Sequence, residues 1–564
     1  MKKYTEYKEL NLSKIGKEVK DYWEENDIFN KSLKSREGNE QFVFFEGPPS
    51  ANGIPGIHHV MARTIKDLFC RYQTLKGKYV ARKAGWDTHG LPIELGVESK
   101  LGISKEDIGK TISVDDYNKA CRVEVMRFKD KWDDITKKMG YWVDLDNPYI
   151  TFDNKYIESV WYLLSELYKK NYLYKGYTIQ PYSPAAGTGL SSHELNLPGC
   201  YKDVKDTTVI GQFKVKTEQK IKKCPWGFED GAPIPDNLFL LAWTTTPWTL
   251  PSNTALAVNP KIEYVLVKTF NPYSGNPISV ILAENLVNTY FPEKNRELSF
   301  EDYKPGDKNV PFKIIARTKG KNLIGIEYEQ LIPYINPGEG AFRVIAGDYV
   351  TTEDGTGIVH IAPTFGADDK RVAQDAGVPP LVVIDNAGNR QPLVDKTGKF
   401  YKIEELDPDF VVKNVNVDLY GEVAGRYVKP DYEKGESQFE DTLDVFLCLW
   451  LKKHNRAFKV EKYIHNYPHC WRTDKPILYY PLDSWFVKTT SVKERMIELN
   501  KTINWKPQAT GTGRFGNWLE NLVDWNLSRS RFWGVPLPIW MTEDKKEQIC
   551  IGSIEQLKNE IDKA

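Results

Sequence analysis

Apolar and polar positions near the amino terminus follow the order strand, loop, helix. The run 41–46, QFVFFE, is short, aromatic and β-branched, which predicts a buried strand. After a loop rich in glycine and proline, apolar residues recur at helical spacing over 57–75, and Gly77 marks the end of the helix. A second apolar stretch, 78–82, leads into GWDTHG. The pattern predicts a β-α-β unit of a parallel sheet, with its loop at the carboxyl end of the first strand.

Length and composition indicate an ordinary globular protein. The 564 residues exceed one usual core, so about two to four domains are expected. No apolar run reaches membrane-spanning length, and the charged first 29 residues predict an amphipathic helix instead of a secretory signal, hence a cytoplasmic protein. Basic and acidic residues balance at 77 each, so a nucleic-acid partner needs local basic patches. The lysine-rich stretch 220–223 is expected to be a solvated surface.

Seven cysteines without a CxxC pair fit reduced thiols better than a disulfide framework or a zinc finger.

Of eight histidines, His58 and His59 are adjacent at the start of the predicted helix. A helix start presents unpaired N–H groups and partial positive charge, so this position favours a phosphate ligand. Taken alone, such a pair more often caps or packs the helix start.

Five segments, in this order, resemble the class I isoleucyl-tRNA synthetases: GPPSANGIPGIHH, GWDTHGLPIELGVE, WTTTPWTLPSN, GTGIVHIAPTFGADD and DWNLSRSRFWGVPLPIW. The resemblance covers almost the whole chain. It implies an α/β fold in which a Rossmann-like parallel-sheet catalytic core is split by a large inserted β-rich editing domain. It also implies ATP-dependent activation of isoleucine, transfer to tRNA(Ile), and hydrolytic proofreading of Val-tRNA(Ile). The segment GWDTHGLPIE disfavours a valyl-tRNA synthetase, the nearest alternative in the class.

The resemblance also implies a domain order. The amino-terminal helix and first half of the core are expected at 1–200, the editing insertion at 201–460 and the second part of the core at 461–564. The family's KMSKS loop does not occur in the sequence, so we expect an N-terminal fragment deficient in synthesis whose editing insertion still works. A freestanding aminoacyl-tRNA deacylase or a tRNA-binding protein is the alternative from another class.

The family's HxGH signature is altered in this chain. Its four positions read Gly56-Ile57-His58-His59, so only His59 is in register. The resemblance implies that both histidines act in catalysis by contacting ATP phosphates. We expect His58 to take over one phosphate contact and Gly56, at the same helix entry, to relieve crowding beside it.

The family's amino-acid pocket corresponds to Pro48 beside the reacting carbonyl, Asp87 facing the ammonium group and Trp525 as an aromatic wall. A carboxylate at a strand end can pair with ammonium, and proline and tryptophan suit a branched alkyl chain. Without the family context, Asp87 is as readily a turn or N-cap residue, and Trp525 is more often plain core.

A second site, for editing, is expected because a pocket that binds isoleucine discriminates only weakly against valine. One missing methylene changes binding by only about 1–3 kcal/mol, a general limit for which this enzyme family is itself the worked example. The insertion carries a threonine-dense motif whose hydroxyls can hold water and ester oxygens. The residues that match the family's editing motif are Thr244, Thr245, Thr246, Thr249 and Asn253.

A second wall of this editing site is expected from GTGIVHIAP and FGADD. Asp369 matches the aspartate that anchors the ammonium of the misacylated amino acid, and His360 matches the residue that crowds out isoleucine. A threonine run alone is usually strand propensity, and an Asp-Asp pair alone is usually a solvated turn. Their joint spacing favours the site.

The remaining expectations concern metals and partners. ATP chemistry implies Mg²⁺ held largely by phosphate oxygens and water. Structural zinc is not expected at Ser183, Ala186, Cys470 and Thr473, because only one cysteine is present where relatives have several. Arg529 and Arg531 can bind the tRNA acceptor end or pair with acidic neighbours, and the structural role is favoured. The expected partners are tRNA(Ile), isoleucine and ATP, with no membrane, and the protein is expected to be a monomer.

Overall fold

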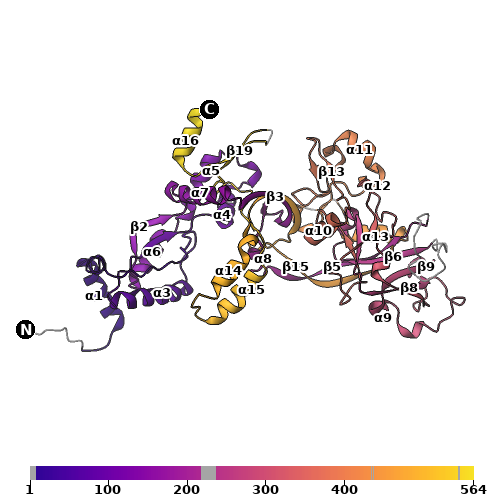
Figure 1. The fold of residues 1–564 in the computed structure, drawn as a ribbon, viewed down its shortest axis with the longest axis horizontal. Coiled ribbons are helices and arrows are strands. Elements are labelled where there is room, and N and C mark those ends of the chain that lie inside the picture. Colours follow the sequence, from indigo (N-terminus) through magenta and orange to yellow (C-terminus); the bar gives the residue numbers. More distant parts are fainter. Residues whose placement is uncertain (1–7, 218–236, 434, 436, 438, 544–545) are drawn as a thin grey trace, which may run out of the picture. The chain divides into compact units, whose positions relative to one another are not determined.

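The computed structural model describes residues 8–217, 237–433, 435, 437, 439–543 and 546–564, so the expected solvated stretch 220–223 lies outside the described residues. The chain divides into two compact units, each assembled from segments distant in sequence (Figure 1). The first unit comprises 1–174, 487–524 and 531–564, and the second comprises 175–486 and 525–530. Within the described ranges, no helix has the length and apolar character needed to cross a membrane.

The first unit is mainly helical. Its strands are the parallel pair β1 (Lys83–Trp86) and β2 (Asp144–Ile150) and the antiparallel pair β18 (Ile539–Met541) and β19 (Gln548–Cys550). Its α-helices are α1 (Leu12–Glu25), α2 (Ile28–Lys34), α3 (Ile57–Leu75), α4 (Leu91–Leu101), α5 (Val114–Val125), α6 (Lys129–Lys138), α7 (Asn154–Lys169), α14 (Lys493–Asn500), α15 (Phe515–Glu520) and α16 (Ile554–Lys563).

The predicted helix over 57–75 is confirmed as α3, but the predicted strand before it is wrong. Only Gln41 bridges Tyr79, in the parallel sense, and the chain from 42 to 50 has no regular structure. Phe45 is 90% exposed. Aromatic and β-branched residues favour a strand, yet between the Gln41 bridge and the hydrogen bond that the Pro49 carbonyl oxygen accepts from Asp87 the segment forms no regular ladder.

The apolar stripe of α3 is also exposed, although such a stripe on a helix usually faces the core of a protein. The stripe comprises Ile57, Met61, Ile65, Leu68, Phe69, Tyr72 and Leu75. Helical periodicity shows which residues share a face, whereas burial requires a second surface that covers it.

Segments distant in sequence meet inside the first unit. Trp533 packs in a buried cluster with apolar residues of α4 and α5, and its Nε1 donates a hydrogen bond of 2.6 Å to the Thr88 carbonyl oxygen. The segment 41–95 and most of the segment 510–540 therefore belong to the same unit.

An arginine buried beside two glutamates reinforces this junction. Arg531 Nε lies 2.9 Å from Glu94 Oε2, and its guanidinium also pairs with Glu98. The other Glu94 oxygen, Oε1, accepts the backbone N–H groups of Phe532 and Trp533, each at 3.1 Å. The favoured structural role of Arg531 is confirmed, and in the second unit Arg529 pairs with Glu194 at 3.2 Å.

Strands gather in the second unit, where a nine-stranded mixed sheet carries the order β10-β8-β9-β6-β12-β7-β11, with β5 joining β6 and β15. A four-stranded sheet has the order β17-β16-β3-β4. The strands are β3 (Leu173–Ser183), β4 (Thr188–Gly189), β5 (Tyr201–Lys214), β6 (Leu238–Thr244), β7 (Ala255–Val258), β8 (Glu263–Phe270), β9 (Pro277–Ala283), β10 (Lys313–Lys319), β11 (Arg343–Ala346), β12 (Ile358–Ile361), β13 (Val383–Ile384), β14 (Arg390–Gln391), β15 (Ala457–Pro468), β16 (Leu478–Val487) and β17 (Trp525–Asn526). The helices are α8 (Ser192–Leu195), α9 (Val287–Tyr290), α10 (Ala367–Asp375), α11 (Pro408–Asn414), α12 (Val417–Gly421) and α13 (Leu443–Lys453).

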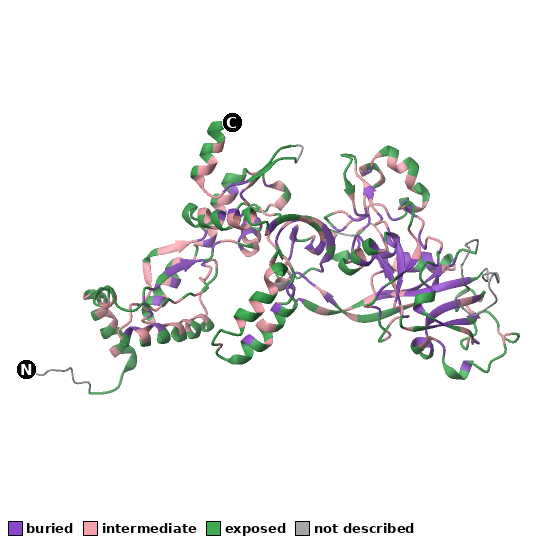
Figure 2. Cartoon of the chain, in the orientation of Figure 1, coloured by how far each residue is buried: buried purple, intermediate pink, exposed green. Residues whose placement is uncertain are grey.

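The central strands of the large sheet are buried on both faces (Figure 2). In β6, Leu238, Leu240 and Ala242 enter one apolar cluster, whereas Phe239 and Leu241 enter another. Because successive side chains point to opposite faces, two covered faces require an uninterrupted apolar run. The sequence LFLLA of β6 meets this requirement.

The β-rich insertion predicted at 201–460 lies within the second unit. Its first strand, β5, and the strand that closes it, β15, pair antiparallel along their length. The unit extends beyond the predicted insertion on both sides because the four-stranded sheet belongs to it. The predicted domain boundaries themselves stay predictions.

Replacing the buried arginine tests how the junction of the first unit is held. Arg531→Met is expected to lower the free energy of unfolding by about 3–5 kcal/mol, because it leaves two buried carboxylates without their cation. The measurement is urea denaturation of the whole chain. Arg495→Met is the control: it removes an exposed ion pair with Glu498 in the same unit and is expected to change stability little. Equal effects of the two variants would contradict the assignment.

Candidate active site

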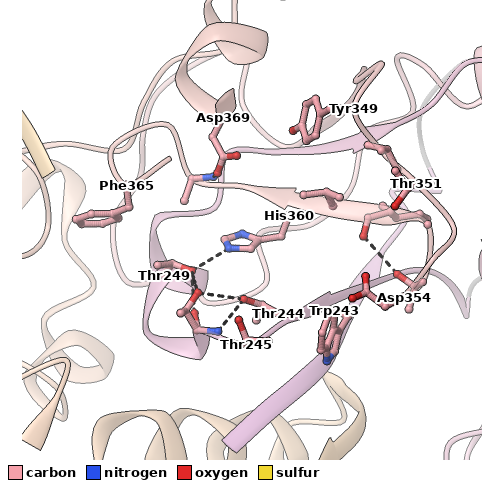
Figure 3. A pocket seen from close by; sticks show the side chains of 18 residues that line it. Trp243, Thr244, Thr245, Thr249, Tyr349, Thr351, Asp354, His360, Phe365 and Asp369 are labelled. Atoms are coloured by element: carbon pink, nitrogen blue, oxygen red, sulfur yellow. Dashed lines mark hydrogen bonds between the residues drawn. The ribbon is translucent and has the colours of Figure 1, made fainter. Parts of the chain in front are cut away.

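A cavity of about 370 Å³ opens in the second unit (Figure 3). It lies where the end of β6, the 3-10 helix η2 (Pro247–Ser252), strand β12 with the loop before it, and the start of α10 meet. Six of the seven predicted editing residues line this cavity: Thr244, Thr245, Thr246, Thr249, His360 and Asp369. The structure thus brings two motifs separated by about a hundred residues into one pocket.

The threonines form a turn with fixed hydroxyls. β6 ends at Thr244, whose Oγ1 accepts the backbone N–H of Thr246 at 3.1 Å. Thr249 Oγ1 donates to the Thr246 carbonyl oxygen at 2.8 Å. Pro247 at the first position of η2 is compatible with a helix start, where its missing N–H has no partner to lose. The hydroxyl groups are therefore held at set positions along one wall.

A buried ion pair between Asp444 and Lys429 stabilises this turn. Asp444, in the first turn of α13, accepts the backbone N–H of Trp248 at 2.9 Å. Burial raises the pKa of Asp444 to about 6, while Lys429, whose Nζ lies 3.7 Å from its Oδ2, lowers it. The Trp248 ring packs edge-on against Phe365, which lines the pocket. The cation therefore favours the ionised form of the carboxylate that fixes the threonine turn.

The hydrogen bonds of His360 define its tautomer. Asn253 Oδ1 accepts the hydroxyl of Tyr328 at 2.8 Å, and Asn253 Nδ2 donates to the Ala255 carbonyl oxygen at 2.8 Å, which identifies the amide nitrogen. That nitrogen lies 3.3 Å from His360 Nδ1, so Nδ1 accepts. The proton is therefore on Nε2, which donates to Thr249 Oγ1 at 2.9 Å.

His360 consequently acts as a neutral wall. Burial lowers its pKa to about 4, so the imidazole is uncharged at neutral pH, and both nitrogens already have partners. It has no free lone pair with which to abstract a proton. This arrangement fits its predicted role of limiting side-chain size. Asn253, predicted as an editing residue, does not line the cavity and instead orients His360 from behind.

Asp369 supplies a buried carboxylate in the first turn of α10. Its Oδ2 accepts the backbone N–H of Ala362 at 2.8 Å, which pins the carboxylate beside the end of β12. Burial is the main cause that raises its pKa to about 6, and Asp368 raises it further. Gly366 leaves the space for this side chain, because a Cβ added there would lie 2.6 Å from Asp369 Cγ. An ionised carboxylate in this setting is suited to an ammonium group.

Sequence reasoning missed the far wall of the pocket. Gly357 has a φ of +73°, and a Cβ there would lie 2.4 Å from Ala283 Cβ, so only glycine lets the chain approach the sheet at this point. The glycines of GTG were the available signal for a tight turn that brings the preceding loop to the site. The lining residues outside the motifs include Tyr349, Thr351 and Asp354, whereas Trp243 and Phe365 lie within the motifs but were not predicted to line the site.

The altered histidine signature lies in the first unit, at the start of α3. The Gly56 N–H donates to His59 Nδ1 at 2.9 Å, and the two imidazole rings are 3.8 Å apart. A Cβ on residue 56 would lie 2.9 Å from His58 Cε1, so Gly56 does relieve crowding beside His58. Burial, then His58, lowers the pKa of His59. The phosphate contacts stay a prediction.

The predicted amino-acid pocket is distributed over both units. Asp87 follows β1 in the first unit, its N–H donates to the Pro49 carbonyl oxygen at 2.9 Å, and burial raises its pKa. Pro48 also belongs to the first unit, whereas Trp525 begins β17 in the second and is 59% exposed. Their joint role in binding isoleucine therefore stays a prediction.

Structural zinc does not fit the position where relatives carry zinc ligands, which in this chain holds Ser183, Ala186, Cys470 and Thr473. Ala186 offers no side-chain donor, and Ser183 Oγ accepts the Ala186 N–H at 3.2 Å. Cys470 is buried in an apolar cluster with Leu190, Leu195 and Ile477. Among the described residues, no group of three or more His, Cys, Asp or Glu side chains is placed to hold a metal ion.

The comparison with protein families settles the membership of the chain. A family model described as "tRNA synthetases class I (I, L, M and V)" matches residues 18–564. The chain belongs to the class I tRNA synthetases. Membership of this synthetase family confirms the α/β fold class predicted from the motifs.

Similar class I synthetases include isoleucine–tRNA ligases from several bacteria. The protein from Bacteroides fragilis is 66% identical over 563 residues, covering 100% of this chain and 48% of the relative. Those from Bacteroides thetaiotaomicron and Clostridium tetani are 62% and 43% identical, covering 100% and 98% of this chain and 49% and 46% of the relatives. The chain thus spans about half the length of the curated relatives it matches.

Solved synthetase structures show only a weak likeness. A ternary complex of LeuRS, tRNA and LeuAMS from Agrobacterium radiobacter K84 gives a TM-score of 0.34 at 16% identity, covering 96% of this chain and 52% of that chain. The cytosolic leucyl-tRNA synthetase editing domain of P. knowlesi gives 0.28 at 16% identity, covering 46% and 98%.

Asp369 should lower the stability of the folded protein at neutral pH. Its folded pKa of about 6 exceeds the usual 3.8, so its contribution to stability is full below pH 3.8 and is lost as pH rises through 6. Asp369→Asn is expected to raise the free energy of unfolding at pH 8 by about 1–3 kcal/mol, and by much less at pH 4. Urea denaturation at both pH values measures this. The exposed neighbour provides the control Asp368→Asn, and an Asp369→Asn gain that is equal at both pH values would contradict the assignment.

Proposed function

We propose that the chain carries the core and proofreading regions of an isoleucine–tRNA ligase, and that the pocket in the second unit hydrolyses Val-tRNA(Ile). The observation that carries the proposal is the convergence of the threonine turn, neutral His360 and ionised Asp369 on one cavity. The relatives named isoleucine–tRNA ligase support the choice of isoleucine over valine as the cognate amino acid.

Each wall of the pocket has a task suited to ester hydrolysis. An aminoacyl ester is already activated, so the site needs an oriented water more than a strong base. The hydroxyls of the threonine turn can bind that water and the ester oxygens, and Asp369 can bind the ammonium group. His360 limits the space for the side chain, which favours valine over the larger isoleucine.

The synthetic reaction is proposed from the first unit. In this proposal His58 and His59, at the start of α3, bind ATP phosphates, and Asp87 binds the isoleucine ammonium group. Mg²⁺ bound with ATP would supply positive charge at the phosphates and would take most of its ligands from phosphate oxygens and water. The partners are isoleucine, ATP and tRNA(Ile), and the protein is proposed to be a cytoplasmic monomer. The six described cysteines are free and buried, which suits a reducing compartment.

A second candidate is an aminoacyl-tRNA deacylase without synthetic activity. The observation in its favour is that every residue lining the pocket belongs to the second unit. The groups proposed to act in ester hydrolysis therefore all belong to the second unit.

Removing the buried carboxylate tests the hydrolytic site. Asp369→Ala is expected to slow Val-tRNA(Ile) deacylation by the 564-residue chain by about two orders of magnitude, because losing one partner of a buried charge pair costs about 2–5 kcal/mol. The readout is loss of labelled valine from charged tRNA. Asp368→Ala, which removes the exposed neighbouring carboxylate outside the pocket, should retain the rate. A wild-type rate for Asp369→Ala would refute the hydrolytic assignment.

Amino-acid choice is tested by ATP–pyrophosphate exchange in an enzyme of the relatives' length that contains this chain. Isoleucine is expected to support exchange at least about tenfold better than valine at equal subsaturating concentration. Asp87→Asn should weaken both reactions, because the ammonium group loses its counter-ion. Faster exchange with valine would favour a valyl enzyme, and exchange with neither amino acid would favour the deacylase.

A further inference from the structure

One buried hydroxyl at the pocket has no partner. Among side-chain polar atoms that are buried without a hydrogen bond in the described part of the chain, Tyr349 Oη is the one that belongs to a residue lining the cavity. The hydroxyls of Thr244, Thr246 and Thr249, by contrast, are engaged with the backbone of the turn or with one another. Burying a hydroxyl without a partner costs free energy, so a ligand group that formed a hydrogen bond with Tyr349 Oη would offset that cost.

The ring of Tyr349 is held in place by apolar packing. Tyr349 lies between β11 and β12 and packs on a buried cluster that includes Ala257, Ile345 and Val350. Gly347 leaves room for the ring, since a Cβ there would lie 3.3 Å from Tyr349 Cε1. The hydroxyl is therefore presented at a fixed point of the wall.

Tyr349 lines the same cavity as Asp369 and lies near enough for the Asp369 charge to act on its phenol. Figure 3 shows the two side chains on the same side of the cavity, with the tyrosine hydroxyl turned toward Asp369. Burial raises the pKa of Tyr349, and the charges of Asp369 and Asp368 raise it further, so the phenol stays protonated. A phenol oxygen can accept one hydrogen bond while its own proton is donated, and it cannot serve as a base here.

We propose that Tyr349 Oη and Asp369 together bind the α-ammonium group of the aminoacyl ester. Asp369 supplies the negative charge, and Tyr349 accepts a second ammonium N–H and so sets the direction of the carbon–nitrogen bond. The ligand class is an α-amino acyl ester with a free amine. This inference rests on the proposed hydrolysis of Val-tRNA(Ile) and assigns a further substrate-binding residue to that site.

Tyr349→Phe separates a binding role from a structural role. The variant removes one oxygen that has no partner in the free protein, so its melting temperature should equal or exceed that of the wild type. Deacylation of Val-tRNA(Ile) by the whole chain should slow at least about tenfold, as expected for losing a hydrogen bond to a charged group. An unchanged rate would overturn the proposal, whatever the melting temperature of the variant.

The ammonium assignment is tested with tRNA(Ile) carrying 3-methylbutanoate, which is valine without its amino group. Wild type and Tyr349→Phe are expected to hydrolyse this ester at rates within about twofold of each other, because the lost contact is absent from the substrate. Equal slowing of both esters would instead place Tyr349 on the water or the ester and overturn the assignment.

Two further variants complete the design. Tyr432→Phe is the matched control, because the Tyr432 hydroxyl is buried in the same unit and donates to the Pro476 carbonyl oxygen at 3.0 Å. It should lower the melting temperature and leave deacylation unchanged. Asp369→Ala shows which claim fails. If Asp369→Ala deacylates Val-tRNA(Ile) at the wild-type rate, the proposed function is wrong. If Asp369→Ala is slow but Tyr349→Phe keeps the wild-type rate, only the role of Tyr349 is wrong.

Discussion

Burial of the Asp369 carboxylate is the constraint on which the pocket depends. One oxygen is used to hold the Ala362 N–H at the end of β12, and Gly366 is required to make space for the side chain. The remaining hydrogen-bonding capacity of the carboxylate is available to the cavity, whose lining residues include no lysine or arginine. A charge in such surroundings is unfavourable for the fold and favourable for a cationic ligand, so stability and binding are opposed at this residue.

In both units a nearby cation stabilises buried carboxylates. In the first unit, Arg531 offsets the charges of Glu94 and Glu98 and joins segments distant in sequence. In the second unit, Lys429 favours the ionised form of Asp444, and Asp444 holds the threonine turn. Buried charges are tolerated where a partner is fixed beside them, and here the partners also fix the elements that carry the site.

Neutral hydrogen bonds then refine the pocket. Asn253 defines which nitrogen of His360 carries the proton, and that proton fixes the hydroxyl of Thr249. Asn253 matched the motif, yet its function here is one step removed from the cavity. A motif records which residues recur together, whereas contact with a ligand depends on how strand, turn and helix pack. Tyr349 shows the converse, since it lines the cavity without belonging to any of the motifs used.

The sequence by itself determined the local elements and the chemistry of the motifs. Local spacing and side-chain size indicate the helix α3, the strand β6 with its continuous apolar run, and the tight turn at Gly355 and Gly357. Tertiary structure alone decided burial. The run 41–46 has strand propensity but forms no ladder, and no described segment covers the α3 stripe, so Val43, Phe45 and the stripe are exposed. Propensity acts within a few residues, whereas burial, tautomers and pKa shifts depend on groups that only folding brings close.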